Sequence, residues 1–172
     1  MRNLEFKTRL TDPKAAFARA RDLGAELWGD LRQTDTYFAV STGRLKLRET
    51  PGFQAELIYY HRDEAAEARP SDYETAPSTS GTALRDLLTH ALGVLAVVKK
   101  RRTLLLMDTT RIHLDNVESL GDFLEIEVPV KEGEEETARQ RFDALLAGLG
   151  YGPADSIRAS YVDLILAKDA LT

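Results

Sequence analysis

Residues 111–128 read RIHLDNVESLGDFLEIEV, and this stretch decides the fold that the sequence predicts. Charged and apolar residues alternate at both of its ends, on either side of a central turn signal. The charged residues of common parity are Arg111, His113 and Asp115 at one end and Glu125 and Glu127 at the other. Successive side chains of a β-strand point to opposite faces. The stretch therefore predicts two neighbouring strands, each with one apolar and one charged face.

Three further segments repeat this alternation: RNLEFKTRL (2–10), GRLKLRE (43–49) and KKR (99–101). Their charged residues of common parity are Glu5, Lys7 and Arg9, then Arg44, Lys46 and Arg48, then Lys99 and Arg101. Each charged face taken alone is typical of an antiparallel sheet with one solvated side. Five such faces together favour a second interpretation, in which the sheet closes and the charges line a tunnel. The pattern leaves both interpretations open.

Helices account for most of the remaining chain and can cover the apolar faces of the strands. Asp12 is a suitable N-cap for a helix over 13–23, which Gly24 ends. Apolar residues at helical spacing predict further helices over 82–93 and 134–149, and we favour a helix over a strand for 160–170. The other expected strands are 34–40, 53–60, 71–76 and 93–108, the last as two strands with a turn. The 61–81 segment also contains a polar loop.

Composition restricts the class of protein. A chain of 172 residues predicts one domain, residues 1–172. The net charge of −5 argues against a nucleic-acid-binding protein. The absence of cysteine excludes disulfides and thiol nucleophiles. No apolar run is long enough to span a bilayer, and no signal-peptide core is present, so we expect no membrane partner and a cytoplasmic location.

Acids and bases on shared strand faces suit one class of ligand. Carboxylates hold Mg²⁺ or Mn²⁺, whereas Lys and Arg side chains hold phosphate oxygens. A closed sheet lined by both would bury many charges at a high desolvation cost, which a strongly charged ligand would offset. The alternation therefore indicates a metal and a phosphate chain as the ligands of a tunnel.

The chain resembles the CYTH domain proteins, also called triphosphate tunnel metalloenzymes. The resemblance rests on NLEFK (3–7) at the place of an ExExK motif and on an ordered series of further motifs. These are DTYF (35–38), RLKLR (44–48), LIYYHRD (57–63), SDY (71–73), KKR (99–101) and RIHLDNVESLGDFLEIEV (111–128). LIYYHRD, SDY and RIHLD are most similar to the class IV adenylate cyclase branch. The resemblance implies an α+β fold, with an eight-stranded antiparallel closed β-barrel and helices packed outside.

The resemblance also implies roles for individual residues. The implied metal ligands for Mg²⁺ or Mn²⁺ are Glu5, Asp115, Glu125 and Glu127. The implied triphosphate-binding residues are Lys7, Lys46, Arg48, Lys99 and Arg101, with Arg44, Arg62 and Arg111 as further candidates. Catalytic roles would fall to Glu5, Lys7, Lys99 and Arg101. The partner would be a small molecule that contains a triphosphate, and a homodimer is left open.

Asn3 stands where the motif has its first glutamate, so the site loses one negative charge. Since carboxylate count contributes to the affinity for hard cations, we expect weaker binding of a second metal. The resemblance favours a cyclase that converts ATP to cyclic AMP and pyrophosphate. The alternatives are a triphosphatase acting on thiamine triphosphate, inorganic triphosphate or a nucleotide, and a module that only binds. His113 is a general base in one interpretation and a hydrogen-bonded packing residue in the other.

Overall fold

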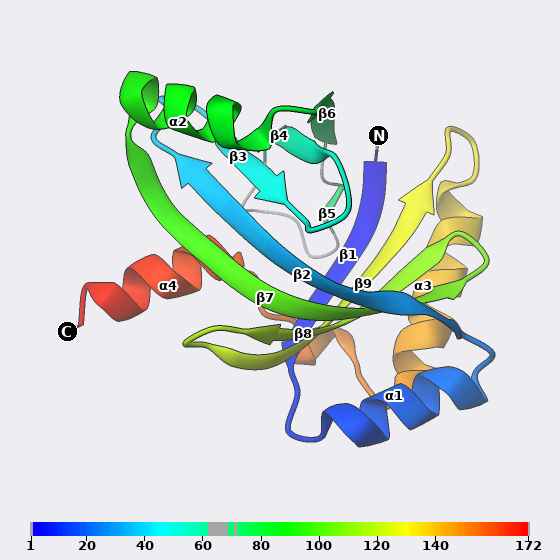
Figure 1. Cartoon of the computed structure of the whole chain (residues 1–172). Coiled ribbons are helices and arrows are strands. Elements are labelled where there is room, and N and C mark those ends of the chain that lie inside the picture. The colour runs from blue at the N-terminus through cyan, green and yellow to red at the C-terminus, as the bar shows by residue number, and fades with distance from the viewer. Residues whose placement is uncertain (1, 62–68, 71, 172) are drawn as a thin grey trace.

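The computed structural model describes residues 2–61, 69–70 and 72–171. The fold is α+β, with a single antiparallel sheet and helices packed on its outer side (Figure 1). The strands are β1 (Arg2–Arg9), β2 (Glu26–Phe38), β3 (Arg44–Glu49), β4 (Ala55–His61), β5 (Arg69–Pro70), β6 (Asp72–Ser78), β7 (Val94–Met107), β8 (Thr110–Val117) and β9 (Gly121–Val130). The helices are α1 (Pro13–Asp22), α2 (Gly81–Leu92), α3 (Glu135–Leu149) and α4 (Tyr161–Asp169), with a short 3₁₀ helix η1 (Pro153–Asp155).

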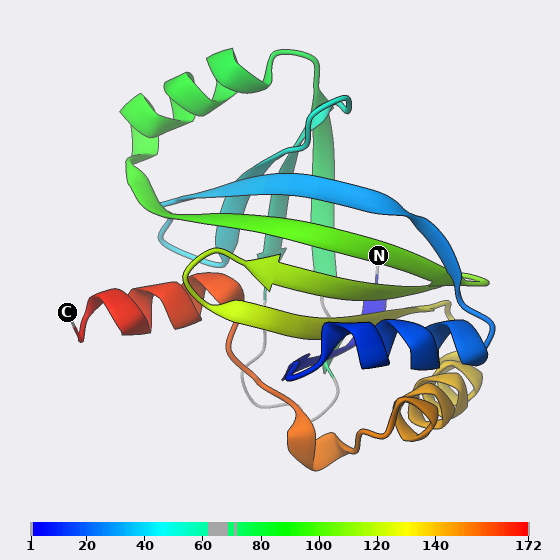
Figure 2. The same cartoon turned by 60° about the horizontal axis from the view of Figure 1, so that its bottom comes forward.

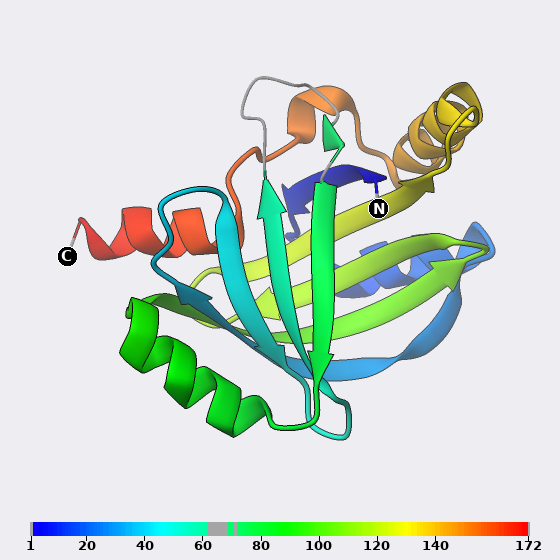
Figure 3. The same ribbon diagram turned by 90° about the horizontal axis from the view of Figure 1, so that it is seen from above.

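The sheet curls into a deep trough. Its strand order is β5-β1-β9-β8-β7-β2-β3-β4-β6, and all neighbours are antiparallel. The long strands β2 and β7 pair with each other, and their register shifts between Leu27 and Gly29 and between Tyr37 and Phe38. Such bulges increase the twist of long strands. The sheet consequently wraps around its concave side (Figure 3).

The prediction of a closed eight-stranded barrel is wrong for the described residues, because the sheet is open. Its two ends are β5 and β6, and no ladder joins them within the described ranges. β5 has two residues and pairs with β1 only at Leu4 and Glu5. It ends at Pro70, which has no backbone N–H to continue a ladder. The α+β class, the antiparallel order and the outer helices are as predicted.

The main core lies on the convex side, between the sheet and helices α1 and α3 (Figure 2). It contains the apolar residues that alternate with charged ones along β1, β8 and β9, including Phe6, Ile112 and Ile126. Phe142 and Leu146 from α3 pack against the same cluster. These strands therefore present their apolar faces to the helices and their charged faces to the concave side, as the alternation predicts.

The helices form where the sequence places them. Asp12 caps α1 by accepting a hydrogen bond from the Ala15 N–H at 3.0 Å. α2 packs Leu84 and Leu88 against the outer side of β3 and β4. The 160–170 segment is a helix, as favoured, and Ser160 caps it. None of the helices in the described part of the chain is both long and apolar enough to cross a membrane.

Two strand predictions are wrong. Residues 93–108 form one strand, β7, because nothing in VLAVVKKRRTLLLM supplies turn residues and its whole length pairs with β2. β2 begins at Glu26, eight residues before the predicted start at Thr34. Gly29 and the mixed charges of the segment hide this first half from pattern analysis, since the bulge at Gly29 breaks the alternation.

Candidate functional site

The strand register arranges the concave side chains in rows. Across β1 and β9, Glu5 lies opposite Glu127 and Lys7 opposite Glu125. Across β9 and β8, Glu127 lies opposite Arg111 and Glu125 opposite His113. Side chains at directly opposed positions lie within contact distance on the same face. The registers therefore place Glu125 between Lys7 and His113, and Glu127 between Glu5 and Arg111.

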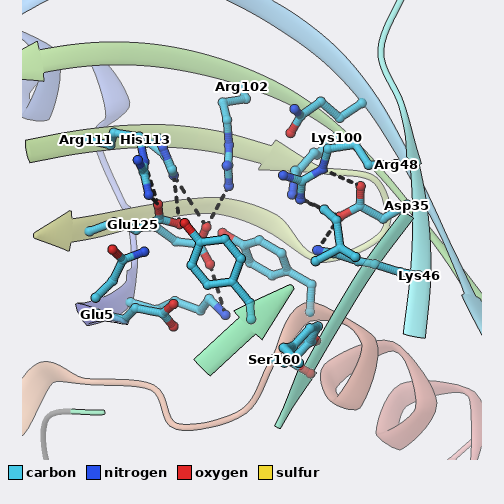
Figure 4. A pocket seen from close by; sticks show the side chains of 18 of the residues that line it. Glu5, Asp35, Lys46, Arg48, Lys100, Arg102, Arg111, His113, Glu125 and Ser160 are labelled. Carbon is cyan, nitrogen blue, oxygen red and sulfur yellow. Dashed lines mark hydrogen bonds and ion pairs between the residues drawn. The ribbon is translucent and has the colours of Figure 1, made fainter. Parts of the chain in front are cut away.

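One cluster forms around the two glutamates of β9, and we call it the glutamate cluster: Lys7, Arg102, Arg111, His113, Glu125 and Glu127. Glu125 pairs with the Lys7 Nζ at 3.1 Å and with the Arg102 Nη2 at 2.6 Å. Glu127 accepts from the Arg111 Nε at 2.8 Å. Figure 4 shows Arg102, Arg111 and His113 pointing toward Glu125. Each glutamate thus has a cationic partner.

A second cluster surrounds one buried carboxylate, and we call it the Asp35 cluster: Asp35, Lys46, Arg48 and Lys100. Arg48 donates to both carboxylate oxygens at 2.7 Å. The Nζ atoms of Lys46 and Lys100 lie 2.9 and 3.5 Å from Oδ2. Asp35 is only 1% exposed, and the three cations come from β3 and β7 (Figure 4). One carboxylate thus holds three bases on the concave side.

Asp115 supports the glutamate cluster from beneath the cavity, which it does not line. It is buried and accepts two hydrogen bonds from Arg102, at 2.7 and 2.6 Å. The Tyr161 hydroxyl donates to its Oδ2 at 2.9 Å, and the Lys7 Nζ lies 4.2 Å from the centre of the Tyr161 ring. Tyr161, the first residue of helix α4, therefore helps to position Asp115 and Lys7.

The carboxylates of both clusters stay ionised far below neutral pH. Burial raises the pKa of Asp35, but the charges of Arg48, Lys100 and Lys46 outweigh it and hold the pKa well below its usual range. Burial acts in the same direction on Glu127, yet His113 and Arg111 lower its pKa to about 2. The pKa of Glu125 is also lowered, by Lys7 above all, against the effect of burial.

Lys100 behaves differently from the other bases. Burial, reinforced by the charge of Arg102, lowers the pKa of Lys100 to about 7, although Asp35 opposes the shift. Arg102 itself is also buried, yet Asp115 and Glu125 raise its pKa well above the usual value. Near neutral pH, Lys100 is therefore the base of the Asp35 cluster whose charge depends on what enters the cavity.

A cavity of about 450 Å³ lies between the two clusters. Most of the predicted site residues line it: Glu5, Lys7, Lys46, Arg48, Arg111, Glu125 and Glu127. Asn3 lines it as well and is buried. Arg44 instead pairs with Asp163 of α4 at 2.6 Å and does not line the cavity. Arg62 lies outside the described residues.

The predicted facing of Lys99 and Arg101 is wrong. Both are exposed on the convex side, and Lys100 and Arg102 line the cavity in their place. Four consecutive bases carry no parity of their own, so alternation within 99–102 could not decide. The turn at residues 108 and 109 does determine which bases face inward, because it pairs Met107 with Thr110 and therefore places Arg102 opposite Asp115.

Sequence reasoning missed two further groups. Asp35 was part of the DTYF motif but received no role, because its position opposite Arg48 follows from the strand register and not from a local pattern. Gln33 lines the cavity, is buried, and its Oε1 has no hydrogen-bond partner among the described residues. Nothing in the sequence alone distinguishes Gln33 from an ordinary strand residue.

The donor set of the glutamate cluster fits a divalent cation. His113, Glu125 and Glu127 each offer a ligand atom, and these atoms lie within 4.8 Å of one another. The His113 Nδ1 is buried and forms no hydrogen bond in the described structure, with the nearest carboxylate oxygens at 3.8 and 3.9 Å. Ligand atoms about 2.1 Å from one ion lie roughly 3 to 4.2 Å apart, so both distances from the His113 Nδ1 are suitable. Asp115, predicted as a ligand, is instead bound to Arg102.

The fold and the site together define the class of protein: an antiparallel sheet curled around a cavity lined with paired acids and bases. The sequence profile of the CYTH domain family matches residues 1–161, and the chain belongs to this family. Its members are typically metal-dependent triphosphatases or nucleotide cyclases. None of the curated proteins compared with the chain matches it.

Solved structures share the fold at low sequence identity. The PH1012 protein from Pyrococcus horikoshii is 24% identical, with a TM-score of 0.85 over 95% of this chain and 99% of that one. A Vibrio parahaemolyticus protein provisionally named an adenylate cyclase is 20% identical, with a TM-score of 0.81 over 96% and 98%. HpAC1 from Hippeastrum, likewise named provisionally and described as having a dominant triphosphatase activity, is 15% identical, with a TM-score of 0.69 over 98% and 96%. At these identities the likeness shows the fold alone.

Proposed function

We propose that this protein binds a linear triphosphate chain together with a divalent cation in the concave cavity and cleaves the chain. One observation carries the proposal: the cavity lies between a cluster with an excess of bases and a cluster that contains a metal-suited donor set. A polyanion suits the first cluster and a cation suits the second. The two ligands together match the charges of the site.

The internal ion pairs suggest how the ligands enter. Burying so many charges is costly, and their mutual pairing offsets that cost before a ligand arrives. Phosphate oxygens can take over Lys7, Arg102 and Arg111, which releases Glu125 and Glu127 for the cation. Each ligand thereby compensates the charges that the other leaves without partners. Binding of metal and triphosphate is therefore cooperative in this proposal.

The proposed roles follow the positions in the cavity. Lys7, Lys46, Arg48 and Arg111 bind phosphate oxygens, and Lys100 and Arg102 take the parts first assigned to Lys99 and Arg101. Glu125 and Glu127 hold the cation, with Glu5 beside Glu127 on the neighbouring strand. Asp115 positions Arg102, to which it is bound by two hydrogen bonds. Asp35 positions the bases that surround it.

This constellation is sufficient for phosphoryl transfer. Such reactions depend mainly on positioning and on neutralising the charge of the phosphoryl oxygens, without a protein nucleophile. A bound divalent cation would add charge neutralisation and orientation of the phosphate chain. The bases of the Asp35 cluster can hold the leaving phosphate groups, because their own carboxylate already fixes their positions.

Hydrolysis is the reaction that the geometry supports best. The aromatic lining residues Tyr37 and Tyr60 are buried, hydrogen-bonded to each other, and lie beneath Lys46. These two rings are therefore packed and offer no open surface on which a nucleotide base could stack, whereas Tyr73, which also lines the cavity, is half-buried. A triphosphatase needs only the phosphate chain and a water molecule, and the charged lining supplies the groups that hold the chain.

Cyclisation of ATP to cyclic AMP and pyrophosphate is the second candidate, and Gln33 favours it. Its buried Oε1 faces the cavity region without a partner, and a fully ionised phosphate chain offers no hydrogen to satisfy it. A nucleoside carries amino and hydroxyl donors that could. The similarity of LIYYHRD, SDY and RIHLD to the class IV cyclase branch points the same way.

A substrate panel tests the proposal. The purified protein is incubated with ATP, thiamine triphosphate or tripolyphosphate, with Mg²⁺ or Mn²⁺, while phosphate, pyrophosphate and cyclic AMP are measured. We expect phosphate release that requires metal and is lost in Glu125→Gln but retained in Glu118→Gln, an exposed position of the same hairpin. Cyclic AMP with pyrophosphate would establish the second candidate. Stabilisation by tripolyphosphate without any product would reduce the protein to a binding module.

A further inference from the structure

His113 differs from the other members of the glutamate cluster, because its buried Nδ1 forms no hydrogen bond among the described residues. The residue is only 3% exposed. Glu125 already pairs with Lys7 and Arg102, and Glu127 with Arg111. Each glutamate therefore has a cationic partner besides His113. The ligand-free protein therefore offers no hydrogen-bond partner to this buried nitrogen between two carboxylates.

A buried polar atom without a partner is costly to keep. The His113 Nδ1 points to the same place as the glutamate oxygens, 3.8 Å from Glu125 Oε2 and 3.9 Å from Glu127 Oε1 (Figure 4). These separations are too long for hydrogen bonds but suit three ligands of one ion. A cation held by these three atoms would give the His113 Nδ1 the partner that it lacks in the ligand-free protein.

On the same concave surface, Asn3 stands where the family motif has its first glutamate. Asn3 and Glu5 lie on β1, beside β9, while His113 lies on β8, on its other side. The site thus carries an amide at Asn3, where a carboxylate would add negative charge, and an imidazole nitrogen at His113. Compared with a site that has a glutamate at position 3, this site has one side-chain oxygen and one negative charge fewer, and it has an imidazole in addition.

We propose that His113 is a nitrogen ligand of the cation site formed with Glu125 and Glu127, and that it shifts the metal preference from Mg²⁺ toward Mn²⁺ and the later divalent transition metals. The inference deepens the proposed function, on which it rests for the presence of a metal. Mg²⁺ demands oxygen ligands in near-ideal octahedral geometry, whereas imidazole suits transition metals. A site with two carboxylates and one imidazole therefore binds Mn²⁺ more tightly than Mg²⁺.

Pulsed electron paramagnetic resonance of bound Mn²⁺ tests the nitrogen ligand without any need for turnover. The intact protein is loaded with Mn²⁺, in the absence and presence of tripolyphosphate, and the spectrum is searched for coupling to ¹⁴N. We expect nitrogen coupling in the wild type and its loss in His113→Phe, with Mn²⁺ bound at least about tenfold more weakly. The Mn²⁺ signal itself should be lost in Glu125→Gln/Glu127→Gln.

The three histidines of the chain allow a control that leaves the site intact. His61 and His90 are both exposed. The double variant His61→Gln/His90→Gln retains only His113, so nitrogen coupling should persist in it unchanged. This variant keeps the test decisive even if His113→Phe fails to fold. His113→Asn, checked by circular dichroism, provides a second substitution at the position.

Three outcomes would overturn the inference: Mn²⁺ bound at a Glu125-dependent site without nitrogen coupling, coupling that disappears in His61→Gln/His90→Gln, or no Mn²⁺ binding in either condition. Calorimetry should in addition give a higher affinity for Mn²⁺ than for Mg²⁺ in the wild type, with a smaller ratio in His113→Phe. A failure to cleave any triphosphate would overturn the proposed function and leave this result standing, because neither measurement depends on turnover.

Discussion

The two clusters on the concave side differ in the carboxylates and other donors that accompany their bases. In the Asp35 cluster, one carboxylate holds Lys46, Arg48 and Lys100, so bases are in excess. In the glutamate cluster, two carboxylates pair with bases from three strands and also face the imidazole of His113. The first cluster has surplus positive charge to offer a ligand, and the second has a set of metal-suited donors.

This difference teaches how one cavity can accept an anion and a cation together. Buried ion pairs add little net stability, and apolar residues of similar size often serve a fold equally well. Their presence in both clusters therefore favours a role in binding. Substitutions that alter one cluster at a time can test this role, and control substitutions on the exposed face of the same strands accompany them.

Removal of the Asp35 carboxylate should have the largest effect. In Asp35→Asn, three bases lose the buried anion that holds them, and an unpaired buried charge costs about 3–5 kcal/mol. We expect a loss of that order in the free energy of unfolding, measured by urea denaturation. Tripolyphosphate should recover part of it, because the phosphate oxygens replace the missing carboxylate.

The control for this variant lies on the same strand. Asp30 is exposed on β2 and accepts a hydrogen bond from the Thr103 hydroxyl. Asp30→Asn should change the free energy of unfolding by no more than about 0.5 kcal/mol. Equal effects of the two substitutions would contradict the assignment of Asp35 as the anion that organises the cluster.

Substitution of neighbouring lysines should separate the two faces of β7. In Lys100→Met, we expect triphosphate cleavage to fall about hundredfold in kcat/KM, close to 2.7 kcal/mol, because a phosphate ligand is lost. Stability should be unchanged or higher, since the burial of Lys100 opposes its charge. Lys99→Met, on the exposed face, should change kcat/KM less than twofold. A larger effect at Lys99 would return the site to the parity first predicted.

The smallest expected effect is the uptake of a proton. The pKa of Lys100 is about 7 without ligand, and an anion beside it favours the charged form and so raises that pKa. Between pH 7 and 8, tripolyphosphate should therefore bind with uptake of up to about one proton. Calorimetric titrations in two buffers of different ionisation enthalpy measure it. Lys100→Met should abolish this uptake, and proton release in the wild type would contradict the lowered pKa.

The sequence predicted most of the site because the outer rows of the sheet alternate cleanly. On β1, β3, β8 and β9, single charged residues are separated by apolar ones, so facing follows directly from parity. At 99–102 four bases stand in a row, and only the pairing of β7 with β8 decides that Lys100 and Arg102 face inward. Asp35 and His113 acquire their meaning from neighbours on other strands, which no local pattern contains.

The same limit applies to the fold. The helices could be predicted because caps such as Asp12 and Ser160 and apolar spacings are local signals. Whether the sheet closes could not be predicted, because closure depends on the pairing of β5 with β1 and of β6 with β4. β5 is a two-residue strand that ends in proline, and its pairing is a long-range property. The first half of β2 is hidden for a related reason, since its bulge breaks the alternation.

Calorimetric titration with tripolyphosphate, performed with saturating Mn²⁺ and again with a chelator, tests the central claim most directly. If the ligands exchange with the internal ion pairs, each should strengthen the binding of the other. We expect at least about tenfold tighter binding of tripolyphosphate with Mn²⁺ present, and loss of this difference in Glu125→Gln/Glu127→Gln. Equal affinity with and without the metal, or no binding in either condition, would contradict the account.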